Sequence, residues 1–337
     1  MKEDTRPLMV TIRCLTYNHE PYIRQCLDGF VMQRTNFRFE VIVHDDASTD
    51  GTAAIIREYA EKYPNIIKPI IEIENQYSKD DGSLETIMDE HTYGKYVAFC
   101  EGDDYWTHPN KLQMQLDFLE ANPDYSMCFT DVRDYDDDHH IMHSRQSSKY
   151  LKDNLGIENG GDKAFFDIML GKCRIQTLTV MVRASLLRQK EKDPVQFMMG
   201  DTQLWLFMSQ KGKIKYIPEC TGIYRQHSGS ACRNPETNDL FRLSMFEMRV
   251  YYCNKYKYTI PPEVKRFYNL ALANVNIKKI KMKREPMFKM FPMYRVQERL
   301  YNYSKKGKVP LFVFQIIWKI ESLLSFLGLR NYLIKRL

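Results

Sequence analysis

The chain has 337 residues and a mass of 40.1 kDa, with 44% hydrophobic and 27% charged residues. This ordinary globular usage excludes collagen, a coiled coil and wholesale disorder, and the length predicts about two domains. The net charge of +6 is unevenly spread, because residues 251–337 carry 19 Lys and Arg against four Glu. That region has a net charge of +15 and residues 1–250 have a net charge of −9, so a basic region follows an acidic body.

Strands and helices alternate along the acidic body. Apolar runs predict strands over residues 8–16, 39–43, 66–73, 96–100, 125–130, 176–183 and 213–217. Apolar residues at helical spacing predict helices over 23–31, between a cap at 48–50 and Pro64, over 109–119, and from 200 onward. The polar segments 134–162 and 224–230 predict loops. This order predicts an α/β fold with a Rossmann-like, mostly parallel central sheet and a C-terminal α-helical extension.

The eight cysteines include no CxxC pair, and several lie inside apolar runs. Buried, reduced thiols are therefore predicted rather than zinc ligands. The N-terminus has no secretory apolar segment, and no uncharged apolar stretch reaches the roughly 18 residues that span a bilayer. These features predict a soluble, cytoplasmic body.

Polar side chains follow three of the predicted strands. Thr16, Tyr17 and Asn18 follow the first, Asp45 and Asp46 follow the second, and residues 101–104 follow the fourth. Ligands of parallel sheets bind at the carboxyl ends of the strands, so these clusters form a candidate site. The Asp45–Asp46 pair is consistent with either a solvated, helix-capping turn or a contact to a nucleotide base or ribose.

The fourth cluster, Glu101-Gly102-Asp103-Asp104, places three carboxylates within four residues. Such hard oxygen ligands favour Mg²⁺ or Mn²⁺, which keep open positions for phosphate, and Gly102 lets a diphosphate approach the backbone. An exposed acidic turn is the alternative interpretation.

Two residues further along the chain are also candidates. Asp201 precedes Leu204, Trp205 and Leu206; it is interpreted as a helix cap, a general base, or both. Burial against Trp205 would raise its pKa toward a useful value. His227 is either structural or a ligand of a metal or phosphate.

These residues together resemble the family-2 glycosyltransferases, which have the glycosyltransferase-A (nucleotide-diphospho-sugar transferase) fold. The resemblance covers roughly residues 8–232 and rests on three stretches: Thr16-Tyr17-Asn18, the run VHDDASTDGT over 43–52, and EGDDYW over 101–106 with Lys111-Leu112 and Gln115 after it. The resemblance implies that Thr16, Tyr17, Asn18 and Glu20 frame the nucleotide, and that Asp45, beside Asp46, reads the base. It also implies that Glu101 and Asp103, with Gly102 and Asp104 beside them, form the DxD site, that Asp201 is the base, and that His227 approaches the metal.

Three features depart from the family pattern. Glu101 replaces the usual Asp, Gly200-Asp201 replaces a Glu-Asp pair, and the QxxRW motif of processive synthases is missing from the sequence. The resemblance therefore implies a single-addition, inverting transferase. It would use Mn²⁺ or Mg²⁺ and move a sugar from a nucleotide-diphosphate donor, usually a UDP-sugar, to a glycan or lipid-linked hydroxyl in surface polysaccharide (capsule or lipopolysaccharide) biosynthesis.

Two other classes of function remain open from the residues alone. A nucleotidyltransferase, or another metal-dependent nucleotide-binding α/β enzyme, shares the acidic site but usually carries a Gly-rich phosphate loop, and the chain has neither GxGxxG nor GxxxxGK[ST]. A non-enzymatic module that binds membrane or nucleic acid leaves the carboxylates at the strand ends without a purpose.

The predicted division is a catalytic domain over residues 1–232 and a basic helical region over 233–337. Residues 309–334 have the pattern of an amphipathic or packed helix. The basic region is interpreted either as a solvated helical face or as a peripheral contact with the anionic inner face of the plasma membrane. Nucleic acid is not expected, because no motif for binding it is present.

Overall fold

The computed structural model describes residues 5–79, 81–144, 156–191, 193, 197–229 and 238–265. Most of these residues form an α/β unit that ends at His227, and residues 197–200 with those from 228 onward form a second unit. The elements up to residue 121 are β1 (Leu8–Thr16), α1 (Ile23–Val31), β2 (Arg38–Asp45), α2 (Thr52–Lys62), β3 (Ile67–Ile71), α3 (Ser83–Glu90), β4 (Tyr96–Phe99), β5 (Tyr105–Trp106) and α4 (Lys111–Ala121). They are followed by β6 (Tyr125–Asp136), β7 (Ile141–Met142), α6 (Gly161–Met169), β8 (Val180–Arg183), α7 (Ala184–Leu187), α8 (Gly200–Lys211), β9 (Lys213–Gln226) and α9 (Asn238–Lys255). Short 3₁₀ turns cover Tyr77–Lys79, Gly156–Asn159 and Thr177–Thr179.

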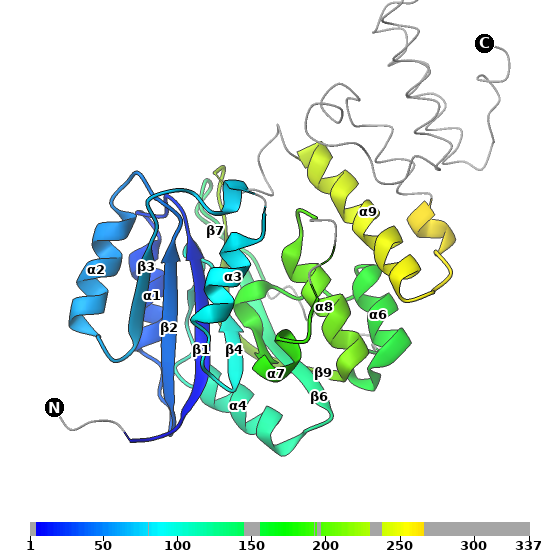
Figure 1. The fold of residues 1–337 in the computed structure, drawn as a ribbon, viewed down its shortest axis with the longest axis horizontal. Coiled ribbons are helices and arrows are strands. Elements are labelled where there is room, and N and C mark those ends of the chain that lie inside the picture. The colour runs from blue at the N-terminus through cyan, green and yellow to red at the C-terminus, as the bar shows by residue number, and fades with distance from the viewer. Residues whose placement is uncertain are drawn as a thin grey trace, which may run out of the picture. The chain divides into compact units, whose positions relative to one another are not determined.

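Within the described residues, nine strands form one sheet in the order β3-β2-β1-β4-β8-β6-β9-β5, with β7 paired to β6 (Figure 1). Strands β3, β2, β1 and β4 are parallel neighbours, and β6 is parallel to β9. Strand β8 runs antiparallel between β4 and β6 and so joins the two parallel parts. The predicted α/β class with its parallel central sheet is confirmed.

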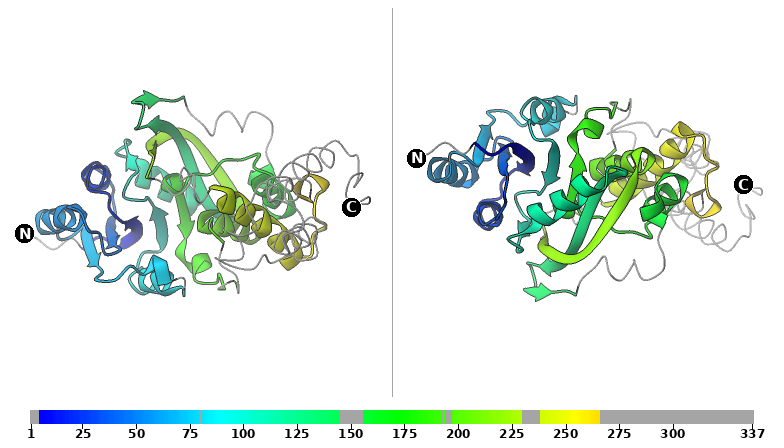
Figure 2. Two further views of the ribbon diagram at one scale, coloured as in Figure 1. Left: turned by 90° about the horizontal axis from the view of Figure 1, so that it is seen from above. Right: turned by 90° about the horizontal axis from the view of Figure 1, so that it is seen from below.

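Helices cover both faces of the parallel strands, and the sequence of β2 reflects this. Its run RFEVIVHD is buried along nearly its whole length, which is typical of a parallel strand covered on both sides. Helices α1 and α3 lie on opposite sides of the sheet (Figure 2). Val41 and Val43 of β2 belong to the large core that includes α1, and Ile42 packs with Leu84 and Met88 of α3. Alternate side chains of the strand therefore belong to two separate apolar layers, one on each face of the sheet.

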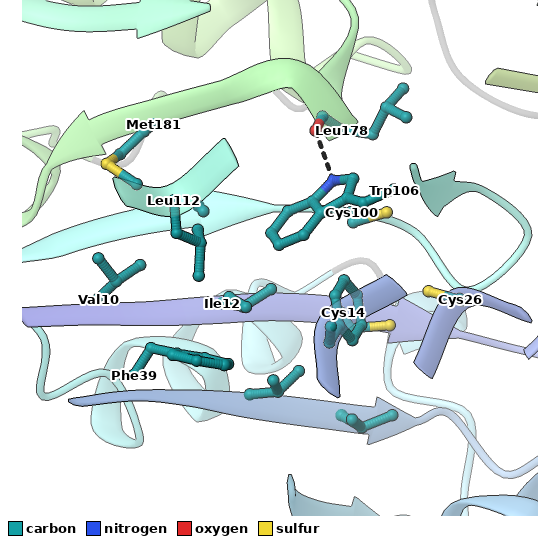
Figure 3. Packing of buried hydrophobic residues seen from close by; sticks show 14 of the residues in the cluster. Val10, Ile12, Cys14, Cys26, Phe39, Cys100, Trp106, Leu112, Leu178 and Met181 are labelled. Atoms are coloured by element: carbon teal, nitrogen blue, oxygen red, sulfur yellow. Dashed lines mark hydrogen bonds between the residues drawn. The ribbon is translucent and has the colours of Figure 1, made fainter. Parts of the chain in front are cut away.

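The large core is organised around Trp106 (Figure 3). Its ring meets Phe30 of α1 edge-on, and its indole N–H donates to the carbonyl of Leu178 at 2.8 Å. Lys111 is fully buried beside it, with its ammonium 4.2 Å from the Trp106 ring centroid and 2.7 Å from Gln115 Oε1. The Lys-Leu and Gln positions of the recognised motif are therefore core residues.

Several predicted boundaries were wrong. Residues 134–136 continue β6, residues 141–142 form β7 and α6 begins at Gly161, so 134–162 is not one loop. Strand β9 extends to Gln226 and includes the first three residues of the predicted 224–230 loop. Residues 177–179 form a 3₁₀ turn before β8, and α3 and β5 were not predicted. Strands β6 and β9 pair along most of their length, and this ladder satisfies the backbone of a polar sequence that reads locally as loop.

The described cysteines confirm the thiol prediction. Six of the seven cysteines that the structure describes are buried. Among the residues that the structure describes, every helix is too short or too polar to cross a bilayer. The second unit includes α9, where Phe197 packs on Tyr251 and Met198 N–H donates to Ser244 Oγ. The predicted helix over 309–334 and most of the basic region lie outside the described residues.

We predict that the buried ammonium of Lys111 makes stability depend on pH. Burial lowers the pKa of Lys111 to about 7, well below the 10.5 of an exposed lysine. Between these values the unfolded chain binds the extra proton, so the free energy of unfolding should rise with pH in this window. Lys111→Met should flatten that rise in thermal unfolding measured from about pH 7 to pH 10. The control Lys95→Met removes a half-exposed lysine, and equal slopes for the wild type and Lys111→Met would contradict the prediction.

Candidate active site

Parallel pairing brings the three predicted clusters to one edge of the sheet. Thr16 lies opposite Asp45 where β1 and β2 end together. The chain leaving β4 continues along β1, with Cys100 N–H donating to Arg13 O at 3.1 Å and Gly102 N–H to Leu15 O at 2.9 Å. The residues after β1, β2 and β4 therefore lie side by side, as the sequence predicted.

Asn18 and Glu20 connect the loop after β1 to the turn before α2. Asn18 Oδ1 accepts from Thr49 N–H at 2.8 Å, and Asn18 N–H donates to Ser48 Oγ at 2.8 Å. Glu20 Oε2 accepts from the N–H of Gly51 at 2.8 Å. Asn18 also has a φ of 54°, a left-handed conformation that asparagine tolerates better than most residues. These two side chains hold the loop after β1 and the turn before α2 together.

Asp45 and Asp46 do not form a solvated turn. Asp45 is 1% exposed and accepts from the hydroxyl and N–H of Ser48, at 2.5 and 3.3 Å. Asp46 is 5% exposed and accepts from the N–H groups of Gln76 and Tyr77, at 2.6 and 3.1 Å. Asp46 thereby fixes the turn after β3 at the same edge, while Tyr17, in the loop after β1, is 47% exposed.

Gly102 is required by close packing between the loops. A Cβ at this position would lie 2.7 Å from Thr16 Oγ1 and 2.9 Å from His19 Nδ1. Both of these atoms are buried without a hydrogen-bond partner. The missing side chain therefore allows the loop after β4 to contact the loop after β1.

Asp103 lies between two histidines. Its Oδ2 is 3.1 Å from His227 Nε2 and 4.0 Å from His19 Nε2. Burial raises the pKa of Asp103, but the hydrogen bond with His227 and the charges of His19 and His227 together outweigh this and hold the pKa below its ordinary value. Burial lowers the pKa of His19 although Asp103 is near. Asp103 is therefore an ionised carboxylate, and its side chain is 18% exposed.

Asp104 points away from this pair and holds the loop to β9. It is 2% exposed, and its Oδ1 accepts from the N–H of Arg225 at 2.7 Å. Burial raises the pKa of Asp104 well above its usual value, and the charges of Asp103 and Glu101 add to the increase. In the structure, Asp104 anchors the loop after β4 to β9. The contact with the sugar donor that the resemblance implied stays a prediction.

Arg225 is the residue that sequence reasoning missed. Its Nε donates to Asp103 O at 2.8 Å, and its two terminal nitrogens donate to Asp137 and Gln25. The rings of Tyr22, Tyr105 and Tyr135 surround the guanidinium, with centroids 4.7, 5.3 and 5.7 Å from Cζ. A lone Arg two residues before His227 was the available signal, but its partners come from three separate segments of the chain.

Glu101 and Asp201 form a second acidic pair. Burial, together with the charges of Asp103 and Asp201, raises the pKa of Glu101 to about 8. Asp201 lies in the first turn of α8, where its carboxylate accepts from Thr202 and Thr177. Burial raises the pKa of Asp201 despite these hydrogen bonds. The alternative interpretation of residues 101–104 as an exposed acidic turn is therefore wrong. Asp201, from a distant part of the chain, lies near this cluster.

The side chains that could ligate a metal fit a divalent cation only in part. No group of three or more His, Cys, Asp or Glu side chains in the described ranges is arranged to hold a metal ion. Asp103 and His227 nevertheless place an ionised oxygen and an imidazole beside each other at the strand edge. Mg²⁺ typically takes one or two carboxylates together with substrate phosphates, so the arrangement fits an ion that is shared with a diphosphate.

The comparisons with known proteins agree with this geometry. Residues 12–171 match the family model described as glycosyl transferase family 2. The uncharacterized protein Rv1520 of Mycobacterium tuberculosis is 36% identical over 221 residues, which are 65% of this chain and 59% of that protein. The chain thus spans about three fifths of the length of the mycobacterial relatives that it matches. The putative teichuronic acid biosynthesis glycosyltransferase TuaG of Bacillus subtilis is 27% identical over 67% of this chain and 82% of its own length.

Two solved structures share the fold. The structure of S. aureus TarS 1-349 in complex with UDP-GlcNAc has a TM-score of 0.53 and 16% identity, over 96% of this chain and 93% of that chain. The mannosyltransferase PcManGT from Pyrobaculum calidifontis, in complex with GDP-Man and Mn²⁺, has the same TM-score and identity, over 95% and 88%. The family match, the named relatives and the shared fold show that the chain belongs to the family-2 glycosyltransferases and has the glycosyltransferase-A fold.

Proposed function

We propose that this glycosyltransferase moves one sugar from a nucleotide-diphosphate donor to a hydroxyl of a glycan or lipid-linked acceptor, with inversion at the anomeric carbon. The observation that carries the proposal is the pair of acidic groups at one strand edge. Asp103 with His227 suits the diphosphate side of the donor, and Asp201 beside Glu101 suits the acceptor side.

A UDP-sugar in surface polysaccharide biosynthesis is the favoured donor and setting. A relative from Escherichia coli, 25% identical over 67% of this chain, is named UDP-Glc:alpha-D-GlcNAc-diphosphoundecaprenol beta-1,3-glucosyltransferase WfaP. TuaG is named for teichuronic acid biosynthesis. Tyr17 and the Asp45–Asp46 pair would contact the nucleoside, with Thr16, Asn18 and Glu20 supporting that end of the site. The domain division at residue 232, a cytoplasmic location and membrane contact through the basic region belong to the same proposal.

Asp103 and His227 would hold Mn²⁺ or Mg²⁺, with Glu101 adjoining. When bound, the ion would neutralise the charge that develops on the leaving nucleoside diphosphate. Asp103 is ionised and ready to bind it, whereas Glu101 keeps its proton at neutral pH. Arg225 would keep the Asp103 backbone in place, and Asp104 would tie the loop to β9.

Asp201 would remove the proton from the acceptor hydroxyl. Its raised pKa makes it a better proton acceptor than an exposed aspartate, and the Thr177 and Thr202 hydrogen bonds orient the carboxylate. Attack from the Asp201 side, opposite the diphosphate held near Asp103, gives a single displacement and therefore an inverted configuration.

Asp201→Asn tests the assignment of the base. It should lower kcat by about 10²- to 10⁴-fold, because proton removal is lost, and leave donor affinity unchanged. Release of nucleoside diphosphate with a GlcNAc-diphospholipid acceptor measures kcat, and calorimetry measures donor binding. Asp103→Ala should abolish both transfer and cation-dependent binding, while exposed Asp117→Asn serves as the control. Full activity of Asp201→Asn would remove it from this role.

The raised pKa of Glu101 predicts a pH-dependent affinity for the cation. Glu101 must lose its proton to act as a ligand, so Mg²⁺-dependent UDP binding should strengthen as the pH rises from about 7 to about 9. Glu101→Gln mimics the protonated form and should remove this part of the dependence. Titration calorimetry at three pH values compares the two proteins, and identical slopes would argue against the prediction.

Arg225→Lys tests the positioning role of the guanidinium. A lysine cannot reach Asp103, Asp137 and Gln25 at the same time, so Mg²⁺-dependent UDP affinity should fall by about tenfold. The matched control is Arg24→Lys, which removes an exposed two-pronged ion pair with Glu58. Equal affinities of the two variants, with unchanged thermal unfolding, would show that Arg225 does not position the site.

A further inference from the structure

A cavity of about 120 Å³ adjoins the candidate active site. It lies at the carboxyl ends of β1 and β4, on the face of the sheet that carries α3. Its apolar wall is made by Leu15, Leu84, Met88 and Phe99, and the rest of the lining is Arg13, Glu85, Cys100, Glu101 and Thr177. None of the apolar residues stood out in the sequence, because they come from three separate elements.

The cavity adjoins the acceptor side of the site. Glu101 forms one wall, and its pKa is raised in part by the charge of Asp201. Thr177 forms another wall and is hydrogen-bonded to the Asp201 carboxylate. In the proposed function the transferred sugar lies between the diphosphate near Asp103 and the base Asp201. The part of the donor that meets this cavity is therefore the sugar, and not the nucleoside.

The lining selects the chemistry of the group that enters. The guanidinium of Arg13 already has hydrogen-bond partners, since its Nη2 donates to Asp89 Oδ1 at 2.7 Å and its Nε donates to Thr92 Oγ1 at 2.9 Å. A sugar hydroxyl placed against Leu84, Met88 or Phe99 would lose its hydrogen bonds to water without replacement. A methyl group there would instead leave water for an apolar surface.

The size of the cavity limits its occupant. It is smaller than the cavity of about 150 Å³ that encloses a benzene molecule in a protein core. A whole pyranose ring with its hydroxyls does not fit, whereas a substituent of a few atoms does. Size and lining together favour a short substituent that ends in a methyl group.

We propose that this cavity binds a methyl-bearing substituent of the transferred sugar, and that Leu84 and Met88 determine this donor specificity. The proposal rests on the function proposed above and names the class of sugar that it uses. Two sources share the required chemistry, namely the acetamido group of an N-acetylhexosamine and the C6 methyl of a 6-deoxyhexose.

The experiment compares donors that differ only in the substituent. Binding to the full chain with Mg²⁺ is measured by calorimetry for UDP, UDP-glucose, UDP-GlcNAc and UDP-6-deoxyglucose. We expect UDP-GlcNAc or UDP-6-deoxyglucose to bind about tenfold more tightly than UDP-glucose, and the donor that gains identifies the source of the methyl group. Equal affinities for all three sugars, with UDP itself bound, would overturn this proposal and leave the proposed function standing. Failure of UDP to bind would overturn both.

Substitutions that fill the cavity test whether the substituent binds there. Leu84→Phe and Met88→Phe should each reduce the preference to less than about twofold and leave the affinity for UDP unchanged, which also reports an intact fold. The control Met142→Phe makes the same kind of change at an exposed position in β7. A preference that survives in both cavity variants, while both still bind UDP, would show that the substituent binds elsewhere.

Discussion

The crowding of carboxylates at one edge of the sheet is the constraint on which the rest of this site depends. The charges of Asp103 and Asp201 raise the pKa of Glu101, and those of Asp103 and Glu101 raise the pKa of Asp104. Removal from water increases that cost, so each group needs its own compensation. Asp103 pairs with His227 and remains charged, Asp104 accepts from the backbone of Arg225, and Glu101 keeps its proton. The site therefore contains carboxylates in different protonation states, which is what separate binding and proton-transfer roles require.

Arg225, Asn18 and Glu20 convert this crowded edge into a defined geometry. Arg225 connects the loop after β4 to β9 and to α1, and the three tyrosines enclose its charge. Asn18 and Glu20 do the same for the loops after β1 and β2. These residues stabilise backbone positions, so any effect on chemistry passes through Asp103 and the loops after β1 and β2. Loops at the ends of buried parallel strands gain in this way the rigidity that a preorganised site needs.

The outcome for individual elements shows where local patterns were sufficient. The strand over 8–16 has the predicted bounds, and the residues predicted at helical spacing, Ile23, Leu27, Phe30 and Val31, lie in α1, because the apolar spacing of both elements coincides with the faces that they bury. The prediction of a loop over 134–162 was wrong, because β6 and β9 satisfy each other's backbone hydrogen bonds along polar residues. Lys111 reads as a surface residue in any local pattern, and only the Trp106 ring and Gln115 explain its burial.

The sequence by itself determined the family, the parallel half of the sheet and the three polar clusters at its edge. These properties follow from short-range signals: apolar runs, turn residues, and motifs whose spacing is local. The tertiary structure decided which carboxylate is ionised, that Asp104 and Asp46 serve the backbone, that Arg225 is central, and that an apolar cavity adjoins Glu101 and Thr177. Protonation and cavities depend on neighbours from separate parts of the chain, such as His227 beside Asp103, and no local pattern contains them.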